Sequence, residues 1–201
     1  MIAPQHAVRF DPLKDLLVAQ SAPPANVMPV NLRALTPFQR ALLVIDGTVT
    51  KFLEAYTMEP VAVVRISQES RSLPIEDHWL EAAAGEAVLV RQVLLKGESS
   101  GTIYAYAVSV LVPARLPDEL MSGLEDLDSS LGRALLTHRL ESRREVLWFG
   151  RERLQDVPDP VKEWAGVDFV SRTYRIISGG LPIMLISERF PAGREGLPSH
   201  H

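Results

Sequence analysis

The sequence predicts an α+β protein: a single, largely antiparallel sheet of about six strands with helices packed on one face. Three observations predict this class. Apolar segments of strand length come in pairs joined by glycine- and serine-rich turns, most clearly at residues 97–101 and 178–180. Helical segments are grouped between these hairpins, unlike the regular alternation of a doubly wound parallel sheet. The 201 residues, 46% of them hydrophobic, are enough for one domain with a real core.

Two helices are predicted before the first strand. Thr36 is a suitable N-cap for a helix over 37–45, and Thr48 for a second helix over 49–56. An Asp-Gly pair breaks the pattern between them, so the two are expected to form a helical hairpin. Each helix has one apolar face, which predicts packing against the sheet.

The remaining elements follow from alternating or apolar segments bounded by turn residues. A short helix is expected within 113–123 and another from Ser130 onward. Residues 69–85 and 156–166 are expected to be irregular, the latter with at most a short turn. The predicted strands are residues 61–68, 87–96, 102–112, 143–150 and the two arms of a hairpin at 174–190.

We expect all of these elements to form one domain over residues 1–201. Residues 1–31 are predicted to hold a short helix, at 12–20, followed by a proline-rich lead. Residues 191–201 are expected to be a flexible tail, because the last hairpin ends before them and termini are often poorly ordered.

Composition narrows the function classes. A net charge of −4 does not indicate a nucleic-acid partner. No segment approaches the ~20 apolar residues of a membrane span, and the N-terminus lacks a signal-peptide pattern, so a cytoplasmic protein is expected. Without cysteine there is no disulfide, thiolate nucleophile or cysteine-ligated metal. The five histidines lack metal-ligand spacing, so no metal site is expected.

Two charged residues fall on apolar strand faces. Because side chains alternate along a strand, Arg91 and Glu188 each share a face with the apolar residues two positions away on either side. A buried charge needs a partner or a task. Both could line one cavity, where Arg91 would bind a ligand carboxylate and Glu188, its pKa raised by burial, would hold a proton. Alternatively, the two pair with each other as a buried salt bridge.

The helix expected from Ser130 has a glycine near its start. Gly132 is a poor helix former, but it allows close backbone approach and would leave N–H groups near Leu131 and Gly132 available to a carboxylate. The alternative is simply a flexible helix start. The motifs of serine hydrolases, phosphate-binding loops, dinucleotide sites and zinc proteases are absent from the sequence.

Together these segments resemble the chorismate lyases, also called chorismate pyruvate-lyases. The resemblance runs from about Leu32 to Phe190 and is strongest to the bacterial branch of about this length found in actinobacteria and cyanobacteria. Each matching stretch is short, and their common order makes the likeness specific. The stretches are LLVIDGTVTKFLEAY, VLVRQVLLKG, SSLGRALL and YRIISGGLPIMLISERF.

The resemblance implies a fold and a reaction. The family fold is a largely antiparallel sheet with helices on one side and an enclosed ligand site beneath two helical flaps. The implied reaction converts chorismate to a hydroxybenzoate and pyruvate without a metal or organic cofactor. 4-Hydroxybenzoate is expected as the product in preference to 3-hydroxybenzoate.

The resemblance also implies roles for individual residues. Arg91 would bind the carboxylate of the ring, and Glu188 would face the ring oxygen at which the enolpyruvyl ether breaks. Backbone groups of Leu131 and Gly132 would help to hold the carboxylate. Val49 stands at a flap position where some relatives carry methionine, so a backbone contact is expected there. Arg175 matches a further arginine of the final stretch and is a secondary substrate-binding candidate.

Two other function classes stay open. The same fold resembles the effector-binding domains of some transcription regulators, which bind small molecules without chemistry, and the arginine and glutamate would serve such binding equally well. Those domains normally follow a winged helix, for which the lead here is too short. A structural protein with a buried ion pair is the third class, and a cavity beside Arg91 would count against it.

Overall fold

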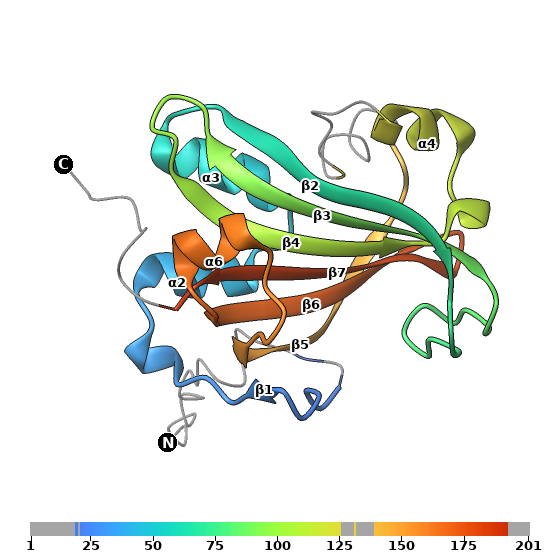
Figure 1. Cartoon of the computed structure of the whole chain (residues 1–201), viewed down its shortest axis with the longest axis horizontal. Coiled ribbons are helices and arrows are strands. Elements are labelled where there is room, and N and C mark those ends of the chain that lie inside the picture. The colour runs from blue at the N-terminus through green and yellow to red at the C-terminus, as the bar shows by residue number, and fades with distance from the viewer. Residues whose placement is uncertain (1–18, 20, 126–130, 132–138, 193–201) are drawn as a thin grey trace, which may run out of the picture.

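The protein is built around a seven-stranded antiparallel sheet (Figure 1). The computed structural model describes residues 19, 21–125, 131 and 139–192. The strands lie in the order β1-β5-β6-β7-β4-β3-β2, and each neighbouring pair is antiparallel. Their bounds are Val27–Met28 for β1, Val61–Ser72 for β2, Ala87–Gly97 for β3, Ile103–Leu111 for β4, Arg143–Arg153 for β5, Asp168–Ser178 for β6 and Leu181–Pro191 for β7.

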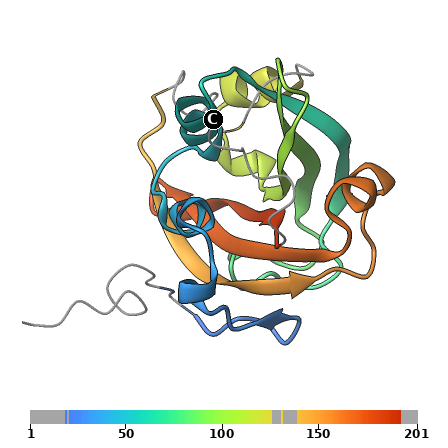
Figure 2. The same cartoon turned by 90° about the vertical axis from the view of Figure 1, so that its left-hand side faces the viewer.

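Helices lie on both sides of this sheet, which is strongly curved (Figure 2). Helices α2, α3 and α4 lie inside the curve, and the short α6 lies outside it. No helix in these described ranges is long and apolar enough to cross a membrane. The helices are α2 Pro37–Val44, α3 Val49–Thr57, α4 Asp118–Glu125 and α6 Asp159–Ala165, with 3-10 turns at Leu32–Ala34 and Pro113–Arg115.

The predicted α+β class and the antiparallel sheet are confirmed. Six of the seven strands were expected, although β2 and β6 are longer than predicted. The polar end of β2, residues 69–72, still pairs with β3, because an edge strand can turn polar side chains to solvent. The helices expected at 12–20 and from Ser130, and the tail beyond residue 192, lie outside the described residues.

Two elements were not expected. Strand β1 lies in the proline-rich lead and pairs with β5 beside Gly150, where an added Cβ atom would lie 2.4 Å from the Met28 carbonyl oxygen. Helix α6 lies in the stretch expected to be irregular. Its prolines fall at the helix start, where proline is tolerated, and the buried Val161 packs beside Phe169 on the outer face of the sheet.

The first helical hairpin covers one end of the inner face. Thr36 and Gln39 form a capping box at the start of α2, as the sequence predicted for Thr36. The apolar faces of both helices then pack on β2, β3 and the end of β7. The buried residues of this contact include Phe38, Leu42, Val49, Leu53, Val63, Leu95 and Phe190.

Strand register brings the two predicted charges to the same face. Arg91 on β3 lies opposite Ser109 on β4, and Ser109 lies opposite Ile186 on β7. Glu188 follows two residues after Ile186 and therefore shares its face. Both charged side chains are buried, with 2% of Arg91 and 6% of Glu188 exposed. The inner face thus carries both groups, on strands separated by β4.

The segment after α3 is fixed to the β3–β4 turn by Glu59. Its carboxylate accepts hydrogen bonds from the backbone N–H groups of Ser99 and Ser100 at 3.0 and 2.8 Å, and from the hydroxyls of Ser100 and Tyr104. Hydrogen bonds from Tyr104 and then Ser100 lower the pKa of Glu59 from 4.5 to about 2. This contact helps to hold α3 over the sheet.

Glu59→Gln is expected to change how stability depends on pH. A carboxylate with a lowered pKa stabilises the folded state fully above its unfolded pKa, near 4.5, and progressively less as pH falls toward 2. The difference in unfolding free energy between the wild type and Glu59→Gln should therefore shrink between pH 4.5 and pH 2. Urea unfolding over this range measures it. Glu98→Gln, in the same turn, is the control for loss of a negative charge, and a constant difference would contradict the prediction.

Candidate active site

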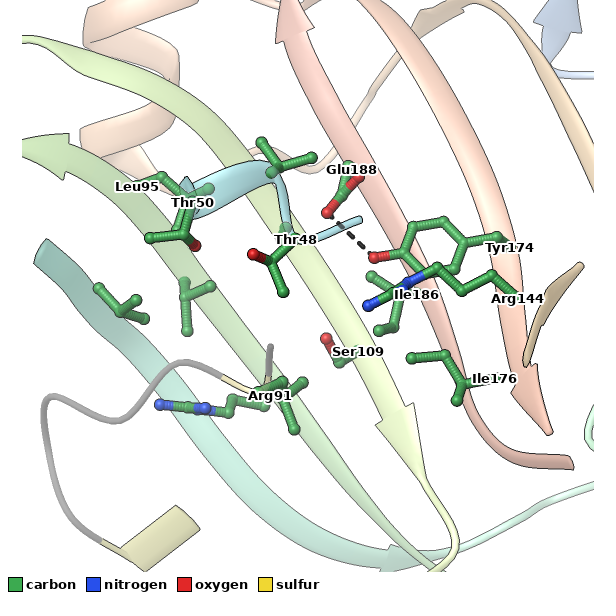
Figure 3. A pocket seen from close by; sticks show the side chains of 15 residues that line it. Thr48, Thr50, Arg91, Leu95, Ser109, Arg144, Tyr174, Ile176, Ile186 and Glu188 are labelled. Carbon is green, nitrogen blue, oxygen red and sulfur yellow. Dashed lines mark hydrogen bonds between the residues drawn. The ribbon is translucent and has the colours of Figure 1, made fainter. Parts of the chain in front are cut away.

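A cavity lies between the inner face of the sheet and the start of α3 (Figure 3). The empty space is about 570 Å³ and includes the part that opens to solvent. The walls are mostly apolar, with a few polar groups among them. These polar groups belong to Thr48, Thr50, Arg91, Ser109, Arg144, Tyr174 and Glu188.

Four predicted site residues line this one cavity. They are Arg91 from β3, Glu188 from β7, Val49 at the first position of α3, and Leu131. Val49 is buried and Leu131 is partly buried. Gly132, predicted to act together with Leu131, lies outside the described residues.

Arg175 is not part of the cavity. Its neighbours along β6, Tyr174 and Ile176, point inward and line the cavity, so alternation turns Arg175 to the outer face. There its Nε atom donates to Glu145 at 2.7 Å, and Nη1 donates to the carbonyl oxygen of Trp79 at 3.1 Å. The structure therefore gives no support to Arg175 as a substrate-binding residue.

Arg91 brings a buried positive charge to the cavity. Strand alternation places it on the inner face among apolar neighbours, as the sequence predicted. Burial and then the positive charge of Arg65 lower the pKa of Arg91 below its usual value. Keeping Arg91 positively charged at this position therefore costs free energy. An anionic ligand beside it would reduce that cost.

Glu188 forms its ion pair with Arg172, a residue that the sequence analysis did not single out. The Nε atom of Arg172 donates to Oε2 of Glu188 at 2.7 Å, and the hydroxyl of Tyr174 donates to Oε1 at 3.1 Å. Among the described residues, the ion pair expected as the alternative, between Arg91 and Glu188, is not formed. Each Glu188 oxygen accepts a hydrogen bond, which is the arrangement of an ionised carboxylate.

The donors to Glu188 keep their protons at neutral pH. Burial lowers the pKa of Arg172, but the charges of Glu188, Tyr174 and Asp46 and the hydrogen bond to Glu188 together outweigh it, and the net shift is upward. Burial, and then the negative charge of Glu188, raise the pKa of Tyr174 well above its usual value. Arg172 and Tyr174 therefore both remain hydrogen-bond donors to Glu188.

Arg172 also ties the site to the helical hairpin above it. Its Nη1 atom donates to the carbonyl oxygen of Ile45 at 2.6 Å, in the turn between α2 and α3. This turn leads directly to Thr48 and Val49, which line the cavity. One buried guanidinium therefore positions both the carboxylate on the sheet and the segment that covers it.

Two further polar groups of the cavity were missed by the sequence analysis. Thr48 precedes α3 as predicted, but its hydroxyl makes no capping hydrogen bond and lines the cavity instead. Arg144, on β5, reaches the cavity beside Tyr174 (Figure 3). Within the described part of the chain, neither Thr48 Oγ1 nor Arg144 Nε has a hydrogen-bond partner, although both atoms are buried.

Fold and site together define a class of protein. It is a small α+β protein with a cavity between a curved antiparallel sheet and the helices that cover it. The effector domain of PhnF from Mycobacterium smegmatis has this fold, with a TM-score of 0.55 and 13% identity over 74% of this chain and 90% of that chain. PhnF from the same organism gives a TM-score of 0.56 and 12% identity over 77% of this chain and 68% of that chain. At these identities the likeness concerns the fold alone.

Sequence comparison identifies the family. The sequence model of the family described as "Chorismate pyruvate-lyase Rv2949c-like" matches residues 43–195, and the chain belongs to this family. Proteins named chorismate pyruvate-lyase from Mycobacterium leprae and Mycobacterium tuberculosis are each 29% identical to it. The first match covers 79% of this chain and 76% of the relative, and the second covers 79% and 82%. The resemblance to chorismate lyases is thereby confirmed.

Proposed function

We propose that this protein is a chorismate pyruvate-lyase that converts chorismate to 4-hydroxybenzoate and pyruvate. The observation that carries the proposal is the position of Arg91 and Glu188. These two oppositely charged, buried side chains come from separate strands and line one cavity in a member of this family. A structural protein would need neither the cavity nor an arginine held in it at a cost.

The reaction needs only the atoms of the substrate. The ring carbon–oxygen bond to the enolpyruvyl group breaks, and one ring hydrogen leaves as a proton. The enolpyruvyl fragment takes up a proton at its methylene carbon and becomes pyruvate, while the ring becomes aromatic. Retention of the ring hydroxyl of chorismate gives 4-hydroxybenzoate. The contribution of the protein is then to hold the reactive conformer and to match its developing charge.

The predicted site residues of the cavity have distinct roles in this proposal. Arg91 binds the ring carboxylate as a charge-assisted pair, aided by backbone groups at Leu131. Glu188, ionised and held by Arg172 and Tyr174, accepts a hydrogen bond from the ring hydroxyl. Its negative charge also stabilises the positive charge that builds on the ring as the ether bond breaks.

The start of α3, which covers the cavity, affects how fast the product can leave. Val49 at the start of α3 contributes the wall above the ring, and its backbone supplies the contact expected at this position. If the cover closes over the bound ring, the product leaves only when part of that cover moves, so product release can limit kcat.

Identification of the aromatic product tests the proposal. The protein is incubated with chorismate, pyruvate is measured by a coupled dehydrogenase assay, and the aromatic product is identified by chromatography. Equal amounts of pyruvate and 4-hydroxybenzoate are expected. 3-Hydroxybenzoate as the sole aromatic product would overturn the product assignment. Binding of chorismate without pyruvate release would overturn the enzymatic role and favour a non-catalytic binding domain.

A further inference from the structure

Arg144 is a second cation on the cavity wall, and the roles proposed above leave it without a task. It lies on β5 opposite Ile176 of β6, and both residues line the cavity. Its Nε atom is buried and has no hydrogen-bond acceptor among the described residues. The adjacent carboxylate, Glu145, is already bound by Arg175 at 2.7 Å and by Arg143 at 2.5 Å.

Arg144 and Arg91 approach the cavity from strands far apart in the sheet. Strands β6, β7 and β4 lie between β5 and β3, so four interstrand spacings of about 4.8 Å separate their backbones along the sheet. Figure 3 shows Arg144 beside Tyr174 and Arg91 on a different side of the cavity. One small acid group cannot reach both guanidinium groups, whereas a ligand with acid groups at two ends can.

The charges on the cavity wall favour a ligand with two acid groups. The Arg172–Glu188 pair is neutral as a unit, which leaves Arg91 and Arg144 as the cationic groups among the described residues of the wall. The positive charge of Arg144 also reaches the Tyr174 hydroxyl, where it opposes the upward pKa shift caused by burial and by Glu188. Arg144 is thus close to the end of the cavity where Glu188 lies.

The surroundings of Arg144 distinguish this end of the cavity from the Arg91 end. Arg144 and Tyr174 also line a second hollow, together with Ile45, Asp46 and Arg172. A guanidinium at this wall can contact a group inside the cavity and one that is leaving it. A fragment released near Glu188 that left through this second hollow would pass Arg144.

We propose that Arg144 binds the second carboxylate of the substrate, the one on the enolpyruvyl group, while Arg91 binds the carboxylate on the ring. This inference rests on the proposed function and assigns the two ends of its site. Thr48, whose hydroxyl makes no hydrogen bond within the described residues, contributes a further donor to the cavity. The pyruvate fragment then remains paired with Arg144 after the ether bond breaks.

The test compares a substrate that has both carboxylates with a product that has one. Arg144→Gln is expected to raise KM for chorismate roughly 10- to 100-fold, the usual range for loss of a charge-assisted hydrogen bond to a carboxylate. The Kd of 4-hydroxybenzoate, measured by calorimetry, should change by less than about threefold. Arg144→Lys, which keeps the charge, should recover part of the loss.

Arg143→Gln is the matched control. Arg143 is the preceding residue, its side chain is 67% exposed, and it pairs with Glu145. Wild-type values are expected for it. If Arg144→Gln keeps the wild-type KM, or weakens 4-hydroxybenzoate and chorismate equally, this inference is wrong while the proposed function stands. If the wild type releases no pyruvate from chorismate, the proposed function fails, and this inference fails with it.

Discussion

Arg91→Met is expected to raise KM for chorismate and Kd for 4-hydroxybenzoate by a similar factor, about 100-fold, equivalent to roughly 2.8 kcal/mol. In the proposed function Arg91 binds the ring carboxylate, which is present in substrate, transition state and product alike. An interaction of equal strength in all three lowers KM and leaves kcat almost unchanged. Steady-state kinetics measure KM, and calorimetry measures Kd. The two constants should change in parallel for Arg91→Met, whereas for Arg144→Gln only KM should rise strongly.

The control for Arg91→Met is Arg65→Met. Arg65 is a neighbouring arginine on β2 that does not line the cavity, so its variant should bind 4-hydroxybenzoate with nearly the wild-type Kd. Circular dichroism shows whether both variants are folded. A folded Arg91→Met protein with normal KM and normal product affinity would refute the carboxylate role of Arg91.

The same variant has an expected effect on stability. Because burial and Arg65 lower the pKa of Arg91, the charged side chain opposes folding at neutral pH. Methionine fills a similar volume without that charge. The unfolding free energy of Arg91→Met should therefore equal or exceed that of the wild type, although binding is lost. Such opposite effects on stability and binding are typical of residues kept for function.

The inward orientation of Arg91 and Glu188 could be predicted from the sequence. Arg91 and Glu188 each lie in a long apolar strand, where the two-residue period decides which face a side chain takes. The same rule, applied to β6, would have excluded Arg175. Tyr174 and Ile176 are the apolar residues of that strand that point inward, so the arginine between them must point outward.

Arg172, the partner of Glu188, could not be predicted in this way. Arg172 lies in a polar stretch that the sequence analysis placed before the strand, whereas β6 begins at Asp168. An arginine there is explained only by its pairing across the sheet with Glu188 on β7. Arg144 was missed for a related reason, because β5 opens with charged residues and nothing local shows which of them turns inward.

Short elements escaped prediction because tertiary contacts decide them. Two residues of β1 are too few to show a period, and the close approach of Gly150 to Met28 explains their pairing with β5. Helix α6 has only seven residues, with proline at its N-cap and again in its first turn. Its burial of Val161 against the outer face of the sheet stabilises it more than its own propensity does.

The second large effect is expected at the buried ion pair. Arg172→Met leaves the Glu188 carboxylate buried with only the Tyr174 hydroxyl as a donor among the described residues, and Glu188→Leu leaves the Arg172 guanidinium buried without its counter-charge. Each change should lower the unfolding free energy by about 3–5 kcal/mol, because an uncompensated charge remains in the interior. Urea unfolding at neutral pH measures the loss.

Replacing the whole group by apolar residues should reverse most of this loss. In the triple variant Arg172→Met/Tyr174→Phe/Glu188→Leu no buried charge or unmatched hydroxyl remains in the group, although the Ile45 carbonyl oxygen loses its donor. We expect it to be at least ~2 kcal/mol more stable than either single variant, since apolar replacements of buried ion pairs are often neutral or stabilising. Chorismate turnover should be absent in all three proteins. A triple variant as unstable as the single ones would show that the ion pair itself stabilises the fold, and any residual wild-type turnover in it would remove Glu188 from the proposed mechanism.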